Sequence, residues 1–171
     1  MDDLAVRTAK PSDIDKLVEL RLSLQRHVKK SNPRIWRITK KGAGLLKQGL
    51  KEGMKEEDSR IIVATVKGKI VGFAHGQVSH RTDYSPDNIG TIMNIYIQKE
   101  FRGKGVGKRL VGELCRFFAS EGVRQVTLRY AIGNREAEKF WKGLGFEPVI
   151  TAANVRLEKL EKRLKRAKEA R

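Results

Sequence analysis

Apolar positions at the start of the chain first form a short β-type run and then recur every three or four residues. Residues 5–9 have the composition of a strand, and Pro11 ends it. Ser12 is a suitable N-cap for a helix over about 13–29. A second helix is predicted over about 42–57. The apolar positions that define the first helix are Ile14, Leu17, Val18, Leu20, Leu24 and Val28.

Runs of β-branched residues dominate the middle of the chain. Residues 60–66 and 70–78 predict a hairpin around the turn at 67–69. The remaining predicted strands cover 91–97, 123–130 and 148–155, and the remaining predicted helices cover about 108–120, 134–142 and 156–171. The order of strands and helices predicts an α/β (α+β) layered fold.

The helix predicted over 108–120 has one apolar face, formed by Leu110, Val111, Leu114, Cys115 and Phe118. We therefore expect Cys115 to lie in the core rather than act as a nucleophile. Because it is the only cysteine, an internal disulfide is excluded. The three histidines do not have metal-ligand spacing, so we predict no metal site.

The segment between the strand at 91–97 and the next helix carries the clearest chemistry. It runs Arg102-Gly-Lys-Gly-Val-Gly107. Glycines let the backbone turn sharply and expose consecutive N–H groups, and the helix that follows adds its positive N-terminal end. Together with Lys104, Lys108 and Arg109, these features predict a site for phosphate or pyrophosphate.

Three phosphate-binding patterns compete for this segment. Arg109 stands where a P-loop needs Ser or Thr, and the three glycines alternate instead of following the dinucleotide spacing. The pattern that remains, Arg/Gln-x-x-Gly-x-Gly/Ala, resembles the acyl-CoA-binding motif of the GNAT superfamily of N-acetyltransferases. A flexible turn is the plain alternative. The stretch from Asn134 through Ala137, Phe140 and Trp141 to Gly145-Phe146 is similar to the second signature of that family, and the similarity spans about 5–150.

This resemblance implies a twisted, mostly antiparallel mixed sheet flanked by helices, whose central parallel strands, 91–97 and 124–130, splay apart. An acetyltransferase domain would cover 1–155, with the amphipathic basic helix 156–171 outside it. Acetyl-CoA would be the cosubstrate. Its pantetheine arm would pair with the backbone of Ile95 and Ile97, and Asn134 would contact the arm or cap a helix. The residues expected around its pyrophosphate are Arg102, Gly103, Lys104, Gly105, Val106, Gly107 and Lys108.

The resemblance also implies direct acetyl transfer to an amine of a small molecule, peptide or protein. The tyrosine expected in the second signature is Trp141 here, and an indole N–H is no practical general acid. Tyr130 and Tyr96 are the nearest candidates for the acid, although both are also explained by ordinary packing. His75 and His80 are candidate bases, with core or surface roles as the alternative. Trp36 could line the acceptor groove or equally anchor a loop onto the core.

Charge adds a second hypothesis. With 37 Lys and Arg against 20 Asp and Glu, the net charge is +17, which favours anionic partners. The basic residues of 20–41 and the 156–171 tail suggest nucleic-acid or ribosome binding on a catalytically weak scaffold as an alternative function. The leucines of the tail equally suit a solvated helix or a homodimer contact. With no apolar run of about 18 residues and no basic, apolar leader, we expect no membrane association and a cytoplasmic location.

Overall fold

The computed structural model describes residues 3–34 and 37–169, with side chains as far as Lys165. Trp36 lies outside the described residues. The elements run in the order β1 (Leu4–Thr8), the 3-10 helix η1 (Pro11–Asp13), α1 (Ile14–Ser31), α2 (Lys40–Gly53), β2 (Ser59–Val66), β3 (Lys69–His80), β4 (Asn88–Ile97), the 3-10 helix η2 (Lys99–Phe101), α3 (Val106–Ser120), β5 (Gln125–Leu128), α4 (Arg135–Lys142) and α5 (Leu157–Glu169).

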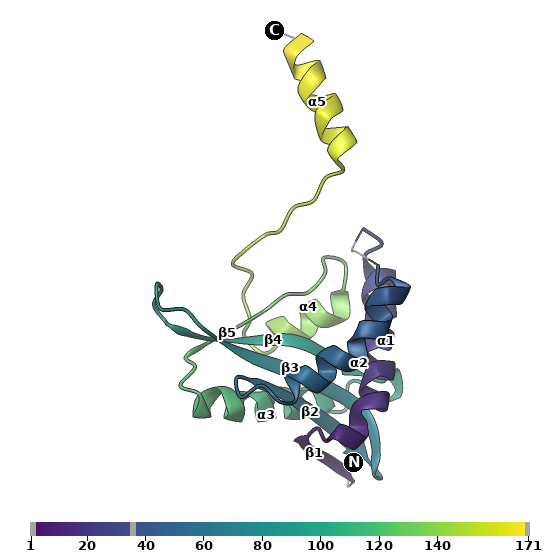
Figure 1. Ribbon diagram of the computed structural model, residues 1–171, viewed down its shortest axis with the longest axis vertical. Coiled ribbons are helices and arrows are strands. Elements are labelled where there is room, and N and C mark those ends of the chain that lie inside the picture. Colours follow the sequence, from purple (N-terminus) through teal and green to yellow (C-terminus); the bar gives the residue numbers. More distant parts are fainter. Residues whose placement is uncertain (1–2, 35–36, 170–171) are drawn as a thin grey trace. The chain divides into compact units, whose positions relative to one another are not determined.

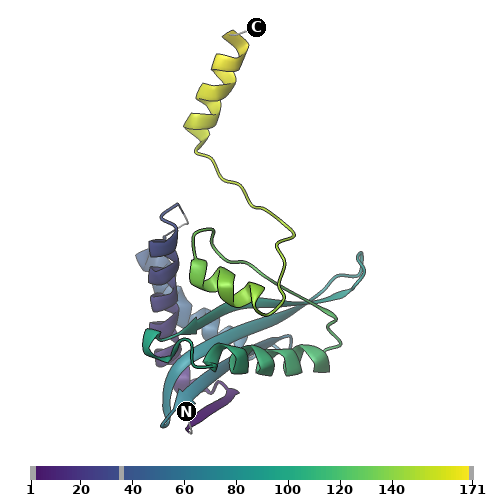
Figure 2. The same ribbon diagram turned by 180° about the vertical axis from the view of Figure 1, so that it is seen from behind.

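The described strands form one mixed sheet in the order β1-β2-β3-β4-β5. The first four strands are antiparallel, and β5 is parallel to β4. Figures 1 and 2 show α3 against one face of the sheet and α1 with α2 against the other. The predicted fold class is therefore confirmed: a mixed, mostly antiparallel sheet flanked by helices. The predicted parallel pair is present as β4 and β5, but it was wrong to expect it at the centre, since β5 is an edge strand of the described sheet.

Each helical layer buries an apolar face against the sheet. Between α1, α2 and the sheet the core contains Leu17, Leu20, Leu50, Ile61, Val63 and Phe73. On the other face Phe118 of α3 lies directly over Gly76 and Gly90, where an added Cβ would come within 2.8 Å and 3.0 Å of its ring. Glycine at these two positions lets α3 approach the sheet this closely.

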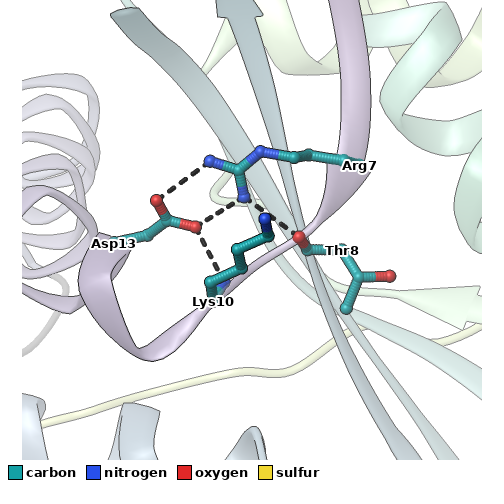
Figure 3. A network of polar contacts seen from close by, with 4 residues as sticks. All are labelled: Arg7, Thr8, Lys10 and Asp13. Carbon is teal, nitrogen blue, oxygen red and sulfur yellow. Dashed lines mark hydrogen bonds and ion pairs between the residues drawn. The ribbon is translucent and has the colours of Figure 1, made fainter.

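A bidentate ion pair joins β1 to the start of α1 (Figure 3). The Arg7 guanidinium donates from Nη1 to Oδ2 of Asp13 at 2.6 Å and from Nη2 to Oδ1 at 3.0 Å. Oδ2 of Asp13 also accepts the backbone N–H of Lys10 at 2.7 Å. Asp13, which is also the N-cap residue of α1, thus fixes this corner, and the prediction that Ser12 caps the helix was wrong. Ser12 instead lies inside η1.

Two further predictions were wrong. Residues 147–156 have no regular secondary structure, so no strand forms over 148–155, and Val149 and Ile150 are exposed. β-Branched composition makes a strand only where a neighbour supplies hydrogen bonds. Cys115 is exposed, because the buried face of α3 passes through Leu114, Phe117 and Phe118 and leaves position 115 outside.

The chain divides into two compact units, residues 1–135 and 136–171. The second unit contains most of α4 and all of α5. The predicted domain boundary near residue 155 remains a prediction. Among the described residues, no helix is both long enough and apolar enough to cross a membrane.

Candidate active site

The two parallel strands separate partway along β4. The pairing of β4 with β5 runs from Ile89 opposite Gln125 to Ile92 opposite Leu128. β4 then continues to Ile97, still paired with β3 through Gly72 opposite Ile97. In the described part of the chain, the β5-facing edge of residues 93–97 therefore has no strand partner. Such an edge presents backbone N–H and C=O groups that a bound molecule can use.

A β-bulge lies where the strands part. On β3 the register passes from His75, opposite Asn94, to Gly76, opposite Ile92. Met93 is therefore an extra residue without a partner on β3. A bulge leaves its extra residue out of the ladder and redirects the strand locally. Nothing in the sequence marked this position, because Thr91 to Ile97 has the composition of an ordinary strand.

The glycine-rich turn lies just beyond the open edge of β4. Gly103 and Gly105 have φ values of +71° and +81°, and no atom lies within 4 Å of a Cβ built on either. Gly105 is the N-cap of α3, which begins at Val106, two residues earlier than predicted. The N–H groups of the first helical turn have no intrahelical acceptor, so they can face an anion. Lys104 and Lys108 are exposed at the same place.

Two arginines of this region turn back onto the protein. Nε of Arg102 donates to the carbonyl oxygen of Ile97 at 3.0 Å, and its guanidinium lies 5.5 Å from the centre of the Tyr96 ring. Nη1 of Arg109 donates to the carbonyl oxygen of Leu4 at 2.7 Å. The expectation that Arg109 faces the phosphate site does not hold, because its side chain is directed to β1.

The loop after β5 lies beside the end of α1. Nδ2 of Asn32 donates to the carbonyl oxygen of Ile132 at 3.1 Å. Asn134 is buried and directly precedes α4, which suits its expected N-cap role. Tyr130 lies two residues beyond β5 and is partly buried. Tyr96 packs against the core cluster under α1, so its ring contributes to the core.

Trp141, which replaces the expected tyrosine, has a packing role within the second unit. Its ring centre lies 4.8 Å from that of Phe140 and 5.2 Å from that of Phe146, both in edge-to-face geometry. Its carbonyl oxygen accepts the backbone N–H of Phe146 at 3.1 Å. The indole thus holds the turn that follows α4.

The two histidines proposed as bases lie in different environments. Nε2 of His75 lies 2.9 Å from Oγ of Ser59, and burial, helped by the positive charge of Arg21, lowers the pKa of His75 to about 4. His75 is therefore neutral near neutral pH. Nδ1 of His80 lies 2.8 Å from Oδ1 of Asn88, at the opposite end of the β3–β4 ladder from Ile97. The structure therefore does not bring His80 together with Ile95 and Ile97.

A sheet whose parallel strands part beside a glycine-rich helix start defines a class of proteins that bind an extended, phosphate-bearing cosubstrate. The model of the acetyltransferase (GNAT) family matches residues 22–146. The chain belongs to this family.

Two curated relatives match over roughly half of the chain. An N-acetyltransferase described as uncharacterized, from Methanocaldococcus jannaschii, is 31% identical over 94 residues, which cover 55% of this chain and 42% of that protein. An aminoglycoside N(6')-acetyltransferase type 1 from Salmonella typhimurium is 28% identical over 89 residues, covering 50% of this chain and 60% of that protein. The matched stretches thus span about half the length of these relatives.

Solved structures share the fold over most of the chain. The aminoglycoside N-acetyltransferase AAC(6')-Iy, solved in complex with CoA, superposes with a TM-score of 0.68 at 21% identity. The alignment covers 90% of this chain and 93% of that one. At this identity the likeness concerns the fold.

Proposed function

We propose that the protein is an acetyl-CoA-dependent N-acetyltransferase. The observation that carries the proposal is the open edge of β4 ending beside the N-terminus of α3, in a chain of the acetyltransferase (GNAT) family. The amine nitrogen attacks the thioester carbonyl carbon, an N–C bond forms and the C–S bond breaks. The amine loses one proton and the CoA thiolate gains one, so the products are an acetamide and free CoA.

The residues present fit an acyl-CoA. The backbone of Ile95 and Ile97 has no partner among the described strands on the side of β5 and suits the amides of a pantetheine arm, in the manner of an added strand. The carbonyl oxygen of Ile97 already accepts a hydrogen bond from Arg102. The open space at Gly103 and Gly105 and the free N–H groups of the first turn of α3 suit the pyrophosphate. Lys104 and Lys108 supply charge there, and Arg102 supports the end of β4. The other residues that we propose to contact the acyl-CoA are Val106, Gly107 and Asn134.

Chemistry at the carbonyl needs an oxyanion donor and a proton source. The bulge at Met93 lies at the level where the pairing of β4 with β5 ends, and a backbone N–H there suits an oxyanion. The attacking amine must be neutral, and a lysine-type amine has a pKa of about 10.4, so its proton has to leave. We propose Tyr130 or Tyr96 as the acid for the thiolate. The Tyr→Phe variant of the true acid should lose about 100-fold in kcat, while the other stays near wild type.

The proposal is tested by release of thiol from acetyl-CoA across a panel of amines, corrected for hydrolysis, with calorimetry of acetyl-CoA alone. The panel includes an aminoglycoside, because one relative is named for that substrate. We expect binding of acetyl-CoA and transfer to at least one amine. Absence of acetyl-CoA binding would overturn the proposal.

A basic surface supports the second candidate function, nucleic-acid or ribosome binding. Seven of the eight Lys and Arg within residues 20–41 are exposed, namely Arg26, Lys29, Lys30, Arg34, Arg37, Lys40 and Lys41. Exposed leucines on α5, at 157, 160 and 164, also suit the predicted homodimer contact. A gel-shift experiment with RNA and DNA at low salt tests this candidate, and absence of any shift would remove it.

A further inference from the structure

Arg21 is a partly buried cation without an anionic partner among the described residues. It lies on α1 one turn after Leu17, which is fully buried, and one residue after Leu20, which is 1% exposed. Burial lowers the pKa of its guanidinium. In the described part of the chain, no hydrogen bond or ion pair joins Arg21 to a carboxylate. By contrast, Arg7 of β1, which is partly exposed, is paired with Asp13.

An unpaired cation in a low-dielectric setting costs stability unless something compensates it. His75, whose pKa is lowered in part by the charge of Arg21, cannot serve as a counterion, because an imidazole that gains a proton adds positive charge. Nε2 of His75 is engaged by Ser59. The ring also lies under the end of α2, since an added Cβ at Gly53 would be 3.5 Å from it. These contacts leave the positive charge of Arg21 without an internal counterion.

Arg21 can nevertheless be reached from outside. Among the described residues, every completely buried side-chain nitrogen or oxygen atom has a hydrogen-bond partner. Since Arg21 has none, its guanidinium nitrogen atoms keep some contact with solvent. A guanidinium that is partly desolvated and not already paired is well suited to carboxylate or phosphate, which it binds through two parallel hydrogen bonds.

The packing of α1 relates Arg21 to the place where β4 and β5 part. α1 packs against both β3 and β4. His75, whose pKa is lowered in part by the charge of Arg21, lies directly opposite Asn94 on β4. Directly opposed residues share a face of the sheet. Asn94 in turn follows Met93, the bulge residue at which β4 departs from β5. The helix that carries Arg21 therefore packs against the two strands that hold His75 and Asn94, at the level where β4 and β5 part.

From this geometry we propose that Arg21 binds an anionic group of the acceptor, so that the preferred acceptors are primary amines that also carry a carboxylate or a phosphate. This inference depends on the proposed acetyl transfer, and it adds the chemical class of the acceptor. His75, kept neutral beside Ser59, leaves the guanidinium as the cation of this site. Two acceptor groups share this chemistry, and the probes below separate them.

The binding test uses protein saturated with CoA and does not require turnover. Probes come in matched pairs: glucosamine 6-phosphate with glucosamine, and phenylalanine with phenylalaninamide. The Nε–Hε resonance of Arg21, assigned by its loss in Arg21→Gln, should shift saturably with at least one anionic member and with neither neutral member. The neutral members shifting it equally, or no saturable shift with either anion, overturns the inference.

Variants complete the test. Arg21→Gln should weaken binding of the anionic probe by about tenfold or more, Arg21→Lys should weaken it less, and Arg26→Gln, an exposed arginine on the same helix, should not change it. Arg21→Gln should keep or raise the melting temperature, because it removes a partly buried charge that has no anionic partner in the described structure. Equal affinity in Arg21→Gln, or a clear fall in its melting temperature, assigns Arg21 a structural role instead. Failure here leaves acetyl-CoA binding intact, so it is distinguishable from failure of the proposed function.

Discussion

The Nη1 atom of Arg109 lies 2.7 Å from the carbonyl oxygen of Leu4, which ties the first turn of α3 to β1 across 105 residues of sequence. Arg109 therefore acts in the fold, although it follows a motif that suggests phosphate binding. We expect Arg109→Gln to lower the free energy of unfolding by about 1 kcal/mol in urea titrations, because a hydrogen bond from a charged donor is lost. Its acetyl-CoA affinity should stay close to wild type.

Lys104→Gln and Lys108→Gln should have the opposite effects: stability should stay close to wild type and the affinity for acetyl-CoA should fall. Both side chains are exposed beside the first turn of α3, so neither contributes much to stability. Each substitution should weaken the binding of acetyl-CoA by about threefold to tenfold in calorimetry. The loss should be smaller at high salt, because salt screens the attraction between lysine and phosphate. An equal loss of affinity in Arg109→Gln would contradict this division of roles.

The elements that position the site were predictable because each has a strong local signal. The hairpin turn at Lys67 and Gly68 has positive φ at both residues, and the chain carries the Gly there that such turns favour. The glycine-rich turn was predicted from the pattern Arg102-Gly-Lys-Gly-Val-Gly107 between an expected strand and an expected helix. Its position between a strand and a helix was confirmed, because glycine patterning and helix periodicity point to the same structure.

What escaped prediction depends on contacts distant in sequence. The extra residue at Met93 exists because β4 pairs with β3 on one side and leaves β5 on the other. Helical periodicity places Arg21 on the apolar face of α1, four residues after Leu17 and three before Leu24, but its lack of a carboxylate partner among the described residues depends on how α1 lies against β3 and β4. The predicted strand over 148–155 failed for the same reason, since composition does not supply a pairing partner.

The ion pair of Arg7 with Asp13 should contribute measurably to stability. Asp13→Asn removes the charge while keeping the shape, and we expect a loss of about 2 kcal/mol in the free energy of unfolding, because one side of the pair is largely buried. Asp15→Asn is the matched control. Its carboxylate contacts Lys47 at 2.6 Å but is fully solvated, so its removal should have little effect. Equal losses in both variants would contradict this prediction.

Stability should depend on pH through His75. Its pKa is lowered from 6.5 to about 4 in the fold, so the unfolded chain takes up a proton that the native protein refuses. The contribution of His75 to the free energy of unfolding is therefore fully present above pH 6.5. It is lost as the pH drops from 6.5 towards 4, by roughly 3 kcal/mol in all. Urea titrations across this window should show the slope in wild type and its reduction in His75→Gln.

Asp13 affects stability in a lower pH range than His75, so the two contributions can be measured separately. Its pKa is lowered mainly by its side-chain hydrogen bond with Arg7, so its contribution is present above the unfolded pKa and is lost as the pH falls through the lower folded value. A slope between pH 6.5 and 4 that His75→Gln leaves unchanged would contradict the assignment to His75.

Cys115 should react in the native protein. It is exposed on α3, so a disulfide reagent should modify one thiol per chain without denaturant. Melting temperature and acetyl-CoA affinity should be unchanged after blocking, because Leu114 and Phe118, not Cys115, form the buried face. A thiol that reacts only after unfolding would contradict its exposure. Thiol-release assays therefore need the blocked protein or a Cys115→Ser variant.

The affinity of Gly105→Leu for acetyl-CoA tests the central claim most directly. The control is Gly68→Leu, since Gly105 and Gly68 have φ values of +81° and +73° and both have open space at the Cβ, so the backbone strain is matched. Calorimetry should find acetyl-CoA binding weakened by about 100-fold or more in Gly105→Leu and unchanged in Gly68→Leu, with similar losses of stability. Wild-type affinity in a folded Gly105→Leu would contradict the assignment of this turn as the phosphate site.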